Sequence, residues 1–191
     1  MTEHELLIKL QSGDESAFKT LVETHQKRVF NTVLAIIQDF EEAEDVSQEV
    51  FMEVYQSVGK FRGESKISTW LYRIATTKAL EQIRKRKTAK RFAFFTSLFG
   101  ESNEILHESV DFIHPGIVLE QQENSKFLFR AIDQLPENQK VAYTLCNIEG
   151  LSYQDIMEVM QLSLSSVESL LFRAKTNLRK SLGNFYRNQN K

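Results

Sequence analysis

Helix-breaking residues are scarce in this chain, and their scarcity limits the possible fold more than any other feature. The sequence has two prolines, Pro115 and Pro136, and seven glycines among 191 residues. Proline and glycine are the residues that most often mark turns and interrupt regular segments. So few of them over this length predict an all-α fold.

Apolar residues recur at helical spacing through most of the chain. Ser68 and Ser152 are expected to cap two of the helices, the second with Asp155 three positions on. The expected helices cover residues 3–11, 14–38, 39–57, 70–87, 115–135, 136–149, 152–160 and 164–182. This pattern predicts two small helical domains, at 1–90 and 114–183, with a flexible linker at 91–113 and a frayed tail at 184–191.

The predicted linker has an aromatic half and an acidic half. The acidic half, residues 101–111, could imitate nucleic acid or fold back on the basic cluster near Arg84. A simple tether is the favoured interpretation, because it requires neither contact.

Composition excludes several classes of protein. A net charge of −2 is not that of a general nucleic-acid binder, so a DNA site would be a local patch. The single cysteine, Cys146, allows no internal disulfide framework and fits a reducing compartment. No segment approaches the roughly 20 apolar residues of a membrane helix, and the first ten residues do not resemble a signal peptide. We therefore expect a cytoplasmic protein without direct membrane insertion.

The segment 151–180 has the layout of a helix-turn-helix: a short helix, a tight turn and a longer helix. Small hydroxyl side chains near the start of the last helix could reach base edges, and cations further along could reach phosphates. Two features fit poorly, because the turn Gln161-Leu162-Ser163 lacks a glycine and Glu168 would face phosphates. An ordinary helical hairpin with a solvated polar face remains the alternative.

The expected fourth helix carries a different surface. At 100° per residue, one narrow sector contains Trp70, Arg73, Thr77, Glu81 and Arg84. A tryptophan with arginines one and four turns further along the helix suits base stacking with phosphate contacts on opened DNA. The glycine-marked loop before it, residues 59–66, could hold an extruded base. The alternative is that the tryptophan is an ordinary core residue.

Taken together, these segments resemble a known family. Residues 45–51 (DVSQEVF) and 61–75 (FRGESKISTWLYRIA) resemble region 2 of the extracytoplasmic-function, or group 4, sigma factors. Residues 135–139 (LPENQ) and the helix-turn-helix after them resemble region 4, so the resemblance covers nearly the whole chain except the linker. It implies a sigma factor that binds core RNA polymerase and directs promoter-specific transcription initiation.

The resemblance also implies partners for each region. Region 2 would bind the clamp helices of the largest polymerase subunit and read the −10 element. Region 4 would read the −35 element and contact the flap of the second-largest subunit. An anti-sigma factor is a further implied partner.

Three sets of residues follow from this mapping. The polymerase-binding set is Asp45, Gln48 and Glu49. The −10 set, with Arg84 added from the basic cluster, is Lys66, Ser68, Thr69, Trp70, Arg73, Thr77, Lys78 and Arg84. The −35 set, with the nearby cation Lys175, is Ser165, Ser166, Glu168, Ser169, Arg173 and Lys175. The family often has asparagine at the position of Thr77, which leaves the base preference there open. It often has a basic residue at the position of Glu168, so either the −35 sequence is unusual or that position does not contact DNA.

Two rival functions fit the sequence less well. An enzyme is disfavoured, because the four histidines are scattered and no metal-ligand spacing, phosphate-binding loop or nucleophile–base set is visible. We expect no catalytic residue, metal, cofactor or small-molecule substrate. A dimeric repressor would use only the C-terminal domain and leave Trp70 and the acidic helix surface without a role. A repressor would bind duplex DNA alone, whereas a sigma factor would bind promoters tightly only with core polymerase.

Overall fold

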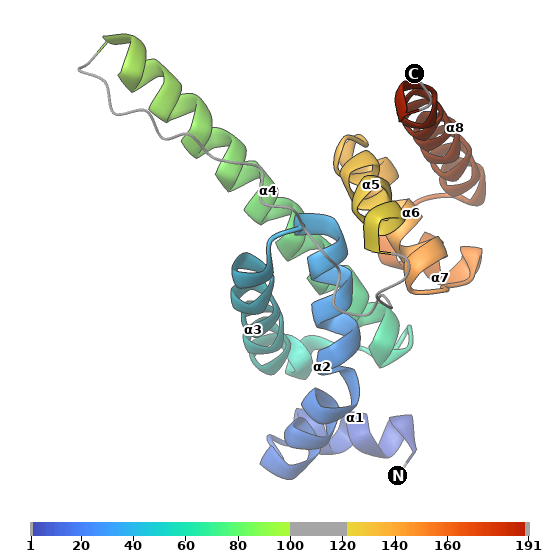
Figure 1. Ribbon diagram of the computed structural model, residues 1–191. Coiled ribbons are helices and arrows are strands. Elements are labelled where there is room, and N and C mark those ends of the chain that lie inside the picture. Colours follow the sequence, from blue (N-terminus) through green and yellow to red (C-terminus); the bar gives the residue numbers. More distant parts are fainter. Residues whose placement is uncertain (1, 100–121, 190–191) are drawn as a thin grey trace.

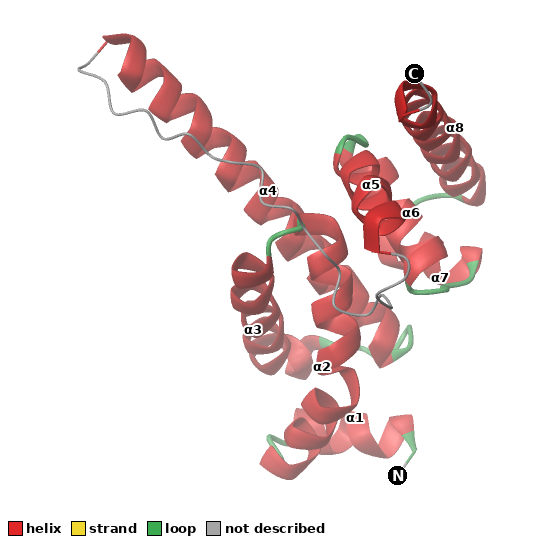
Figure 2. Ribbon diagram, viewed as in Figure 1, coloured by secondary structure: helices red, strands yellow, loops and turns green. Residues whose placement is uncertain are grey.

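A computed structural model describes residues 2–99 and 122–189, and every regular element in these ranges is a helix (Figure 2). The expected all-α fold is confirmed. The acidic half of the predicted linker, 101–111, and the predicted helix start at Pro115 lie outside the described residues.

The N-terminal part begins with three helices whose starts are set by local side chains. They are α1 (Glu3–Gln11), α2 (Glu15–Ile37) and α3 (Phe40–Ser57), followed by the short 3₁₀ turn η1 (Val58–Lys60). The carboxylates of Asp14 and Asp39 accept hydrogen bonds from the amides of Ala17 and Glu42, each at 3.0 Å. Such caps satisfy amides that the first turn leaves without a helical partner.

Helix α4 (Ile67–Phe99) is longer at both ends than the sequence predicted. The amide of Trp70 donates to the carbonyl of Lys66 at 3.1 Å, so the helix has begun before Ser68, and the prediction that Ser68 caps it is wrong. The helix also continues past residue 87, the predicted end, where Ala89, Lys90 and Arg91 are residues that favour helix. It therefore includes residues 91–99 of the predicted linker and forms the long rod in Figure 1.

The described residues of the C-terminal part, 122–189, form four helices and one π-helical turn. These are α5 (Gln122–Asp133), α6 (Glu137–Tyr143), the π-helix η3 (Thr144–Ile148), α7 (Tyr153–Met160) and α8 (Leu164–Gln189). The Ser152 hydroxyl accepts from the Asp155 amide at 3.1 Å, which confirms the predicted cap of α7. Helix α8 extends beyond residue 182, so most of the predicted frayed tail is helical.

The turn between α7 and α8 contains a non-glycine residue in the left-handed conformation that glycine usually occupies. Gln161 adopts the left-handed conformation at φ 55°, and its amide donates to the carbonyl of Met157. Non-glycine residues occupy this region at a conformational cost, usually as single residues at helix ends. The helix-turn-helix predicted from the sequence is confirmed.

The two parts of the chain pack against each other. A single cluster of buried side chains joins residues of the N-terminal part, such as Val33 and Leu71, to residues of the C-terminal part, such as Leu145 and Ile156. The last six residues of α2, 32–37, are all buried. A helix buried on every side needs packing partners all round. Helices α3 and α4 cover one side of α2, and the C-terminal part covers another (Figure 1).

Candidate nucleic-acid interface

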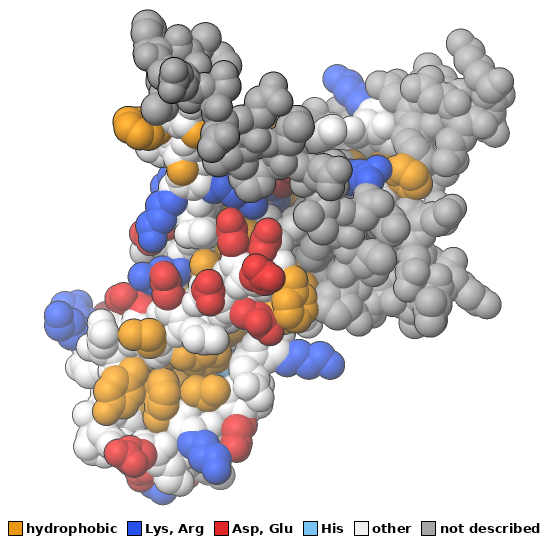
Figure 3. Space-filling model, turned by 60° about the vertical axis from the view of Figure 1, so that its left-hand side comes forward, with side chains coloured by type: hydrophobic (Ala, Val, Ile, Leu, Met, Phe, Trp, Pro, Cys, Tyr) orange, Lys and Arg blue, Asp and Glu red, His pale blue; other side chains and the backbone are white. Residues whose placement is uncertain are grey.

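The predicted polymerase-binding residues lie on the outer face of α3. Asp45, Gln48 and Glu49 are exposed, whereas Val46 and Val50 on the opposite face are buried. Figure 3 brings the α3 side forward and shows acidic side chains gathered next to a hydrophobic area. The surface therefore offers both negative charge and apolar contact area.

The hydrophobic area is a groove of about 810 Å³ between α2 and α3. Its apolar lining residues are Phe18, Val22, Phe30, Phe51, Met52 and Tyr55, and Gln48 also lines it. Met52 and Tyr55 are 61% and 57% exposed. The sequence analysis missed this groove, although two large apolar residues on the solvent side of α3, one and two turns after Gln48, were a visible signal.

Trp70 lies at the start of α4 against the loop before it. Its ring stacks on Phe61, with the ring centroids 4.6 Å apart and the planes 16° from parallel. The side chain is partly buried, and it also lines an open pocket of about 580 Å³ together with Lys60, Arg62 and Arg73. The ring therefore packs on the protein and also borders a cationic hollow, and its role in base stacking stays a prediction.

The other predicted −10 residues on α4 differ in accessibility. Thr77 is exposed and Ser68 is half-buried, but Thr69 is only 2% exposed. Lys78 forms an ion pair with Glu53 of α3 at 3.8 Å. In this arrangement the hydroxyl-bearing start of α4 is only partly available to a ligand.

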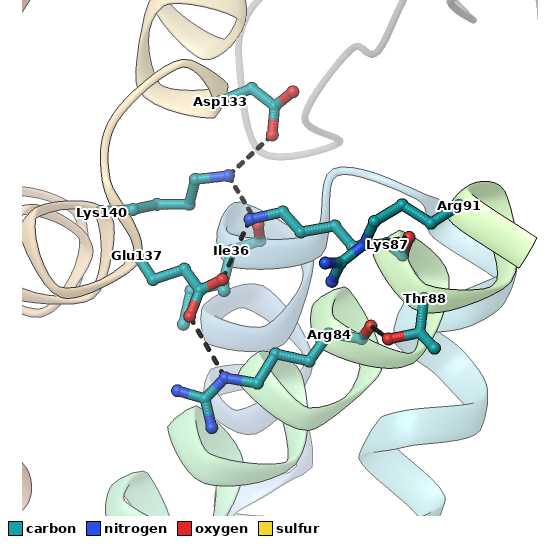
Figure 4. Close-up of polar contacts among 8 residues, drawn as sticks. All are labelled: Ile36, Arg84, Lys87, Thr88, Arg91, Asp133, Glu137 and Lys140. Carbon is teal, nitrogen blue, oxygen red and sulfur yellow. Dashed lines mark hydrogen bonds and ion pairs between the residues drawn. The ribbon is translucent and has the colours of Figure 1, made fainter.

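Three predicted −10 cations contact the C-terminal part. Lys66 Nζ is 3.2 Å from Asp155 Oδ1, Arg84 Nε is 3.3 Å from Glu137 Oε2, and Arg73 Nη2 donates to the Glu158 carbonyl at 2.6 Å. Figure 4 shows Arg84 and Lys87 of α4 converging on the Glu137 carboxylate. The hydrogen bond from Lys87, with added attraction from Arg84, holds the pKa of Glu137 below its ordinary value.

The predicted −35 residues lie along the first half of α8. Ser165, Glu168, Arg173 and Lys175 are exposed, and Ser166 and Ser169 are half-buried. The Arg173 guanidinium donates to the Ser169 hydroxyl at 2.8 Å, so Ser169 orients the Arg173 side chain along the helix.

Ser163, which precedes α8, was missed by the sequence analysis. Its hydroxyl lies 3.1 Å from that of Ser165 and 2.9 Å from that of Ser166. A hydroxyl residue immediately before an apolar-periodic helix is a recognised start signal, which could have identified it. The Ser163 hydroxyl therefore links the serine hydroxyls at the N-terminal end of α8.

Among residues 2–99 and 122–189, no helix has an apolar stretch long enough to cross a bilayer. Within the same residues, no three histidine, cysteine or acidic side chains come together as a metal-binding group.

Comparison with known proteins matches both parts of the chain. Residues 21–89 match the family Sigma-70 region 2, and residues 128–178 match Sigma-70, region 4. The RNA polymerase sigma-H factor of Pseudomonas aeruginosa is 36% identical over 180 residues, which cover 94% of this chain and 93% of that protein. The ECF RNA polymerase sigma-E factor of Escherichia coli K12 is 31% identical over 175 residues, covering 92% and 91%.

Solved structures show the same fold. CnrH, in complex with the cytosolic domain of CnrY, superposes with a TM-score of 0.69 at 19% identity and covers 95% of this chain and 97% of its own. The sigma factor RpoE of Bartonella quintana, in complex with the anti-sigma factor NepR, has a TM-score of 0.64 at 22% identity and covers 87% and 96%. The chain belongs to the extracytoplasmic-function group of the sigma-70 family, whose members are not catalysts but factors for promoter-specific transcription initiation.

Proposed function

We propose that this sigma factor divides its work among three surfaces: α3 binds core RNA polymerase, α4 binds the opened −10 strand, and α8 reads the −35 duplex. The observation that carries the proposal is the stacked, partly buried Trp70 beside a cationic pocket on α4. Duplex readers need no such surface, because bases become available for stacking only when they leave the helix.

The test of this proposal is transcription in vitro with core polymerase, followed by mapping of the start sites. We expect start sites that share sequence elements near −10 and −35, and none from core alone. Transcripts without shared upstream elements would contradict the assignment of α4 and α8 to promoter reading.

The polymerase contact is assigned to the exposed face of α3 and the groove beside it. Negative charge beside apolar surface suits a partner helix with basic edges and an apolar stripe, such as the clamp helices of the largest subunit. The double variant D45A/Q48A should weaken capture of core polymerase while leaving helix content unchanged. E23Q, which changes an exposed residue of α2 paired with Lys19, is the matched control. Unchanged capture of core polymerase by D45A/Q48A would contradict the assignment of the polymerase contact to α3.

The −35 contact is assigned to α8 in the major groove, with the serine cluster at its tip toward base edges. Its cations, Arg173 and Lys175, would bind phosphates and make the affinity salt-dependent. The same C-terminal part would contact the flap of the second-largest subunit.

An anti-sigma factor is proposed as a further partner, in the cytoplasm. The support is that RpoE was solved in complex with the anti-sigma factor NepR, and CnrH in complex with the cytosolic domain of CnrY. Co-expression with a neighbouring reading frame and joint purification would test it, and loss of transcription on adding the partner is the expected result.

The dimeric-repressor alternative makes a different prediction. A repressor would bind promoter duplex equally well with and without polymerase, whereas the proposed factor needs polymerase to hold its two parts in register. Gel-shift titration of the free chain and of its complex with core polymerase distinguishes the two.

A further inference from the structure

We propose that α1 is a positioning element for promoter reading: one face of this short helix holds the loop 61–67 in the shape that presents Phe61 and Trp70 to the opened −10 strand. The inference rests on the proposed −10 function of α4 and names the residues that support it. Helix α1 precedes residues 21–89, which match Sigma-70 region 2, so the family match does not reach it.

Helix α4 receives its cap from a residue distant in sequence. The residue before its first position is Lys66, whose ammonium has only donors and so satisfies none of the amides at a helix start. The Glu3 carboxylate of α1 accepts the Ile67 amide at 2.5 Å instead. A carboxylate at a helix N-terminus is also favoured by the helix dipole. Glu3 therefore fixes the point at which the helix that carries Trp70 begins.

The other end of the loop is held by the other end of α1. The Gln11 side-chain amide donates to the Phe61 carbonyl at 2.7 Å, and the Phe61 ring in turn stacks on Trp70. Between these two anchors the chain passes close to α1, because a Cβ on Gly63 would lie 3.1 Å from Leu7 Cδ2. Gly63 also has φ 71°, in the left-handed region that favours glycine. The middle of the loop therefore approaches α1 more closely than other residue types allow.

These three contacts come from one face of α1. Glu3, Leu7 and Gln11 are four residues apart, and residues at that spacing lie on the same side of a helix. The loop residues that they meet follow in the reverse order along the chain, so the loop runs antiparallel to α1. The helix and the loop are thus matched along their whole length.

Helix α1 has anchors of its own. It has nine residues, and helices this short are marginal by themselves in water. A capping box between Thr2 and Glu5 closes its first turn, and the buried side chain of Leu10 joins the hydrophobic core. Glu5 thus serves α1, whereas the carboxylate of Glu3 serves α4.

The loop also shapes the hollow beside Trp70. Phe61, Arg62 and Ser65 line that pocket of about 580 Å³, and the same three residues line a second hollow of about 650 Å³ that they share with α1. A shift of the loop relative to α1 therefore changes the pocket proposed for the −10 strand. A loop that is held in its binding shape before the strand arrives avoids the entropic cost of ordering it on binding.

Two variants remove the two anchors separately. Glu3→Ala removes the acceptor for the Ile67 amide, and Gln11→Ala removes the donor to the Phe61 carbonyl. Glu3→Gln is the conservative rescue, because its amide oxygen can still accept from Ile67. Glu15→Ala is the matched control, since Glu15 is the acidic first residue of α2 as Glu3 is of α1. Circular dichroism of each variant checks that the helices remain formed.

The contact itself can be followed through Trp70. It is the single tryptophan of the chain, so the intrinsic tryptophan fluorescence of the free protein reports on this side chain alone. When the loop is released, Phe61 no longer covers the Trp70 ring. Acrylamide should therefore quench the fluorescence of Glu3→Ala and Gln11→Ala more strongly than that of the unmodified chain. Glu3→Gln and Glu15→Ala should behave like the unmodified chain.

Strand binding is measured with the complex of the full chain and core polymerase. Fluorescence anisotropy compares a single-stranded oligonucleotide that carries the −10 element of a mapped promoter with a strand of scrambled sequence. Glu3→Ala and Gln11→Ala should each bind the −10 strand about tenfold more weakly, because apparent affinity scales with the fraction of molecules whose loop has the binding shape. Glu3→Gln should recover most of this loss. Binding of the scrambled strand and capture of core polymerase should not change.

Three results would overturn the inference while the unmodified complex still prefers the −10 strand and the proposed function stands. They are unchanged −10 strand binding by both Glu3→Ala and Gln11→Ala, an equal loss for the scrambled strand, and an equal loss in Glu15→Ala. Failure of the unmodified complex to prefer the −10 strand would instead remove the −10 assignment of α4, and this inference with it.

Discussion

Trp70 is held on one side by Phe61 and lines a pocket that is open to a ligand. We predict that Trp70→Ala weakens binding of the polymerase complex to an opened −10 strand by about 1–3 kcal/mol, the usual contribution of a base–aromatic stack. Trp70→Phe retains an aromatic face and should lose much less. Permanganate footprinting of the open promoter measures the difference, and equal losses in the two variants would exclude stacking.

Arg173 is exposed on α8 and is oriented by its bond to the Ser169 hydroxyl. We predict that Arg173→Ala weakens protection of the −35 region and reduces the salt dependence of promoter binding by about one unit in the slope of log K against log salt. Lys19→Ala, which removes one exposed cation of α2, is the control. An unchanged −35 footprint in Arg173→Ala would show that α8 is oriented differently on DNA.

At the level of the elements, the start of α7 depends on one hydroxyl. Ser152 accepts the Asp155 amide, and its own hydroxyl donates to the Asp155 carboxylate. We predict that Ser152→Ala lowers the free energy of unfolding by about 0.5–2 kcal/mol, the cost of losing an N-cap. Urea denaturation measures this, with Ser16→Ala in the first turn of α2 as the control. Equal losses in both variants would mean that the cap does not stabilise the fold.

The helix starts were largely predictable because caps act within four residues. Ser152 caps α7 where the sequence indicated, and α2 and α3 begin directly after Asp14 and Asp39, the first residues of two expected helices. The exception was Ser68, which looked like a cap but lies inside α4 because the helix begins at residue 67. A serine in the first turn of a helix and a serine before it have the same local sequence signature, so propensity alone does not separate them.

The candidate surfaces were predictable only where they lie on one helix. The polar face of α3 and the tip of α8 follow from helical periodicity, since residues three and four apart share a face. The groove between α2 and α3 and the burial of Lys140 depend on residues distant in sequence. The nearly continuous apolar run at the end of α2, residues 32–37, could have predicted a second packing partner for this helix, because a helix that is apolar all round is buried on every side.

For the whole molecule, the two parts of the chain are linked electrostatically as well as by packing. The Tyr72 hydroxyl of α4 donates to Glu149 at 3.0 Å. Burial raises the pKa of Glu149 above its ordinary value, although the bonds from Tyr72 and Thr32 and the charge of Arg28 oppose that rise. Burial and the charge of Glu149 also raise the pKa of Tyr72 well above its usual range. The contact between α4 and the C-terminal part therefore contains one carboxyl group, that of Glu149, which is protonated more readily than an ordinary glutamate.

The direction of the resulting pH effect follows from linkage. A carboxyl group whose pKa is raised in the folded state stabilises that state increasingly as pH falls from neutrality toward 4.5, its ordinary value. Glu137 and Asp155 act oppositely, because their lowered pKa values give stability that is lost as pH falls through those lowered values. His25 also opposes the effect of Glu149. Burial and the charge of Arg28 lower the pKa of His25, so the stability that its neutral form contributes is lost as pH falls below 6.5.

The contribution of Glu149 can be isolated by comparison with Glu149→Gln, which keeps an oxygen that accepts from Tyr72. We predict that Glu149→Gln is more stable than the unmodified chain near pH 7.5, where the buried charge is costly, and that the difference shrinks as pH falls toward 4.5. The other titrating groups are common to both proteins and cancel. Melting temperatures between pH 7.5 and 4.5 measure this difference. A constant difference across that range would show that Glu149 does not titrate with a raised pKa within the contact between α4 and the C-terminal part.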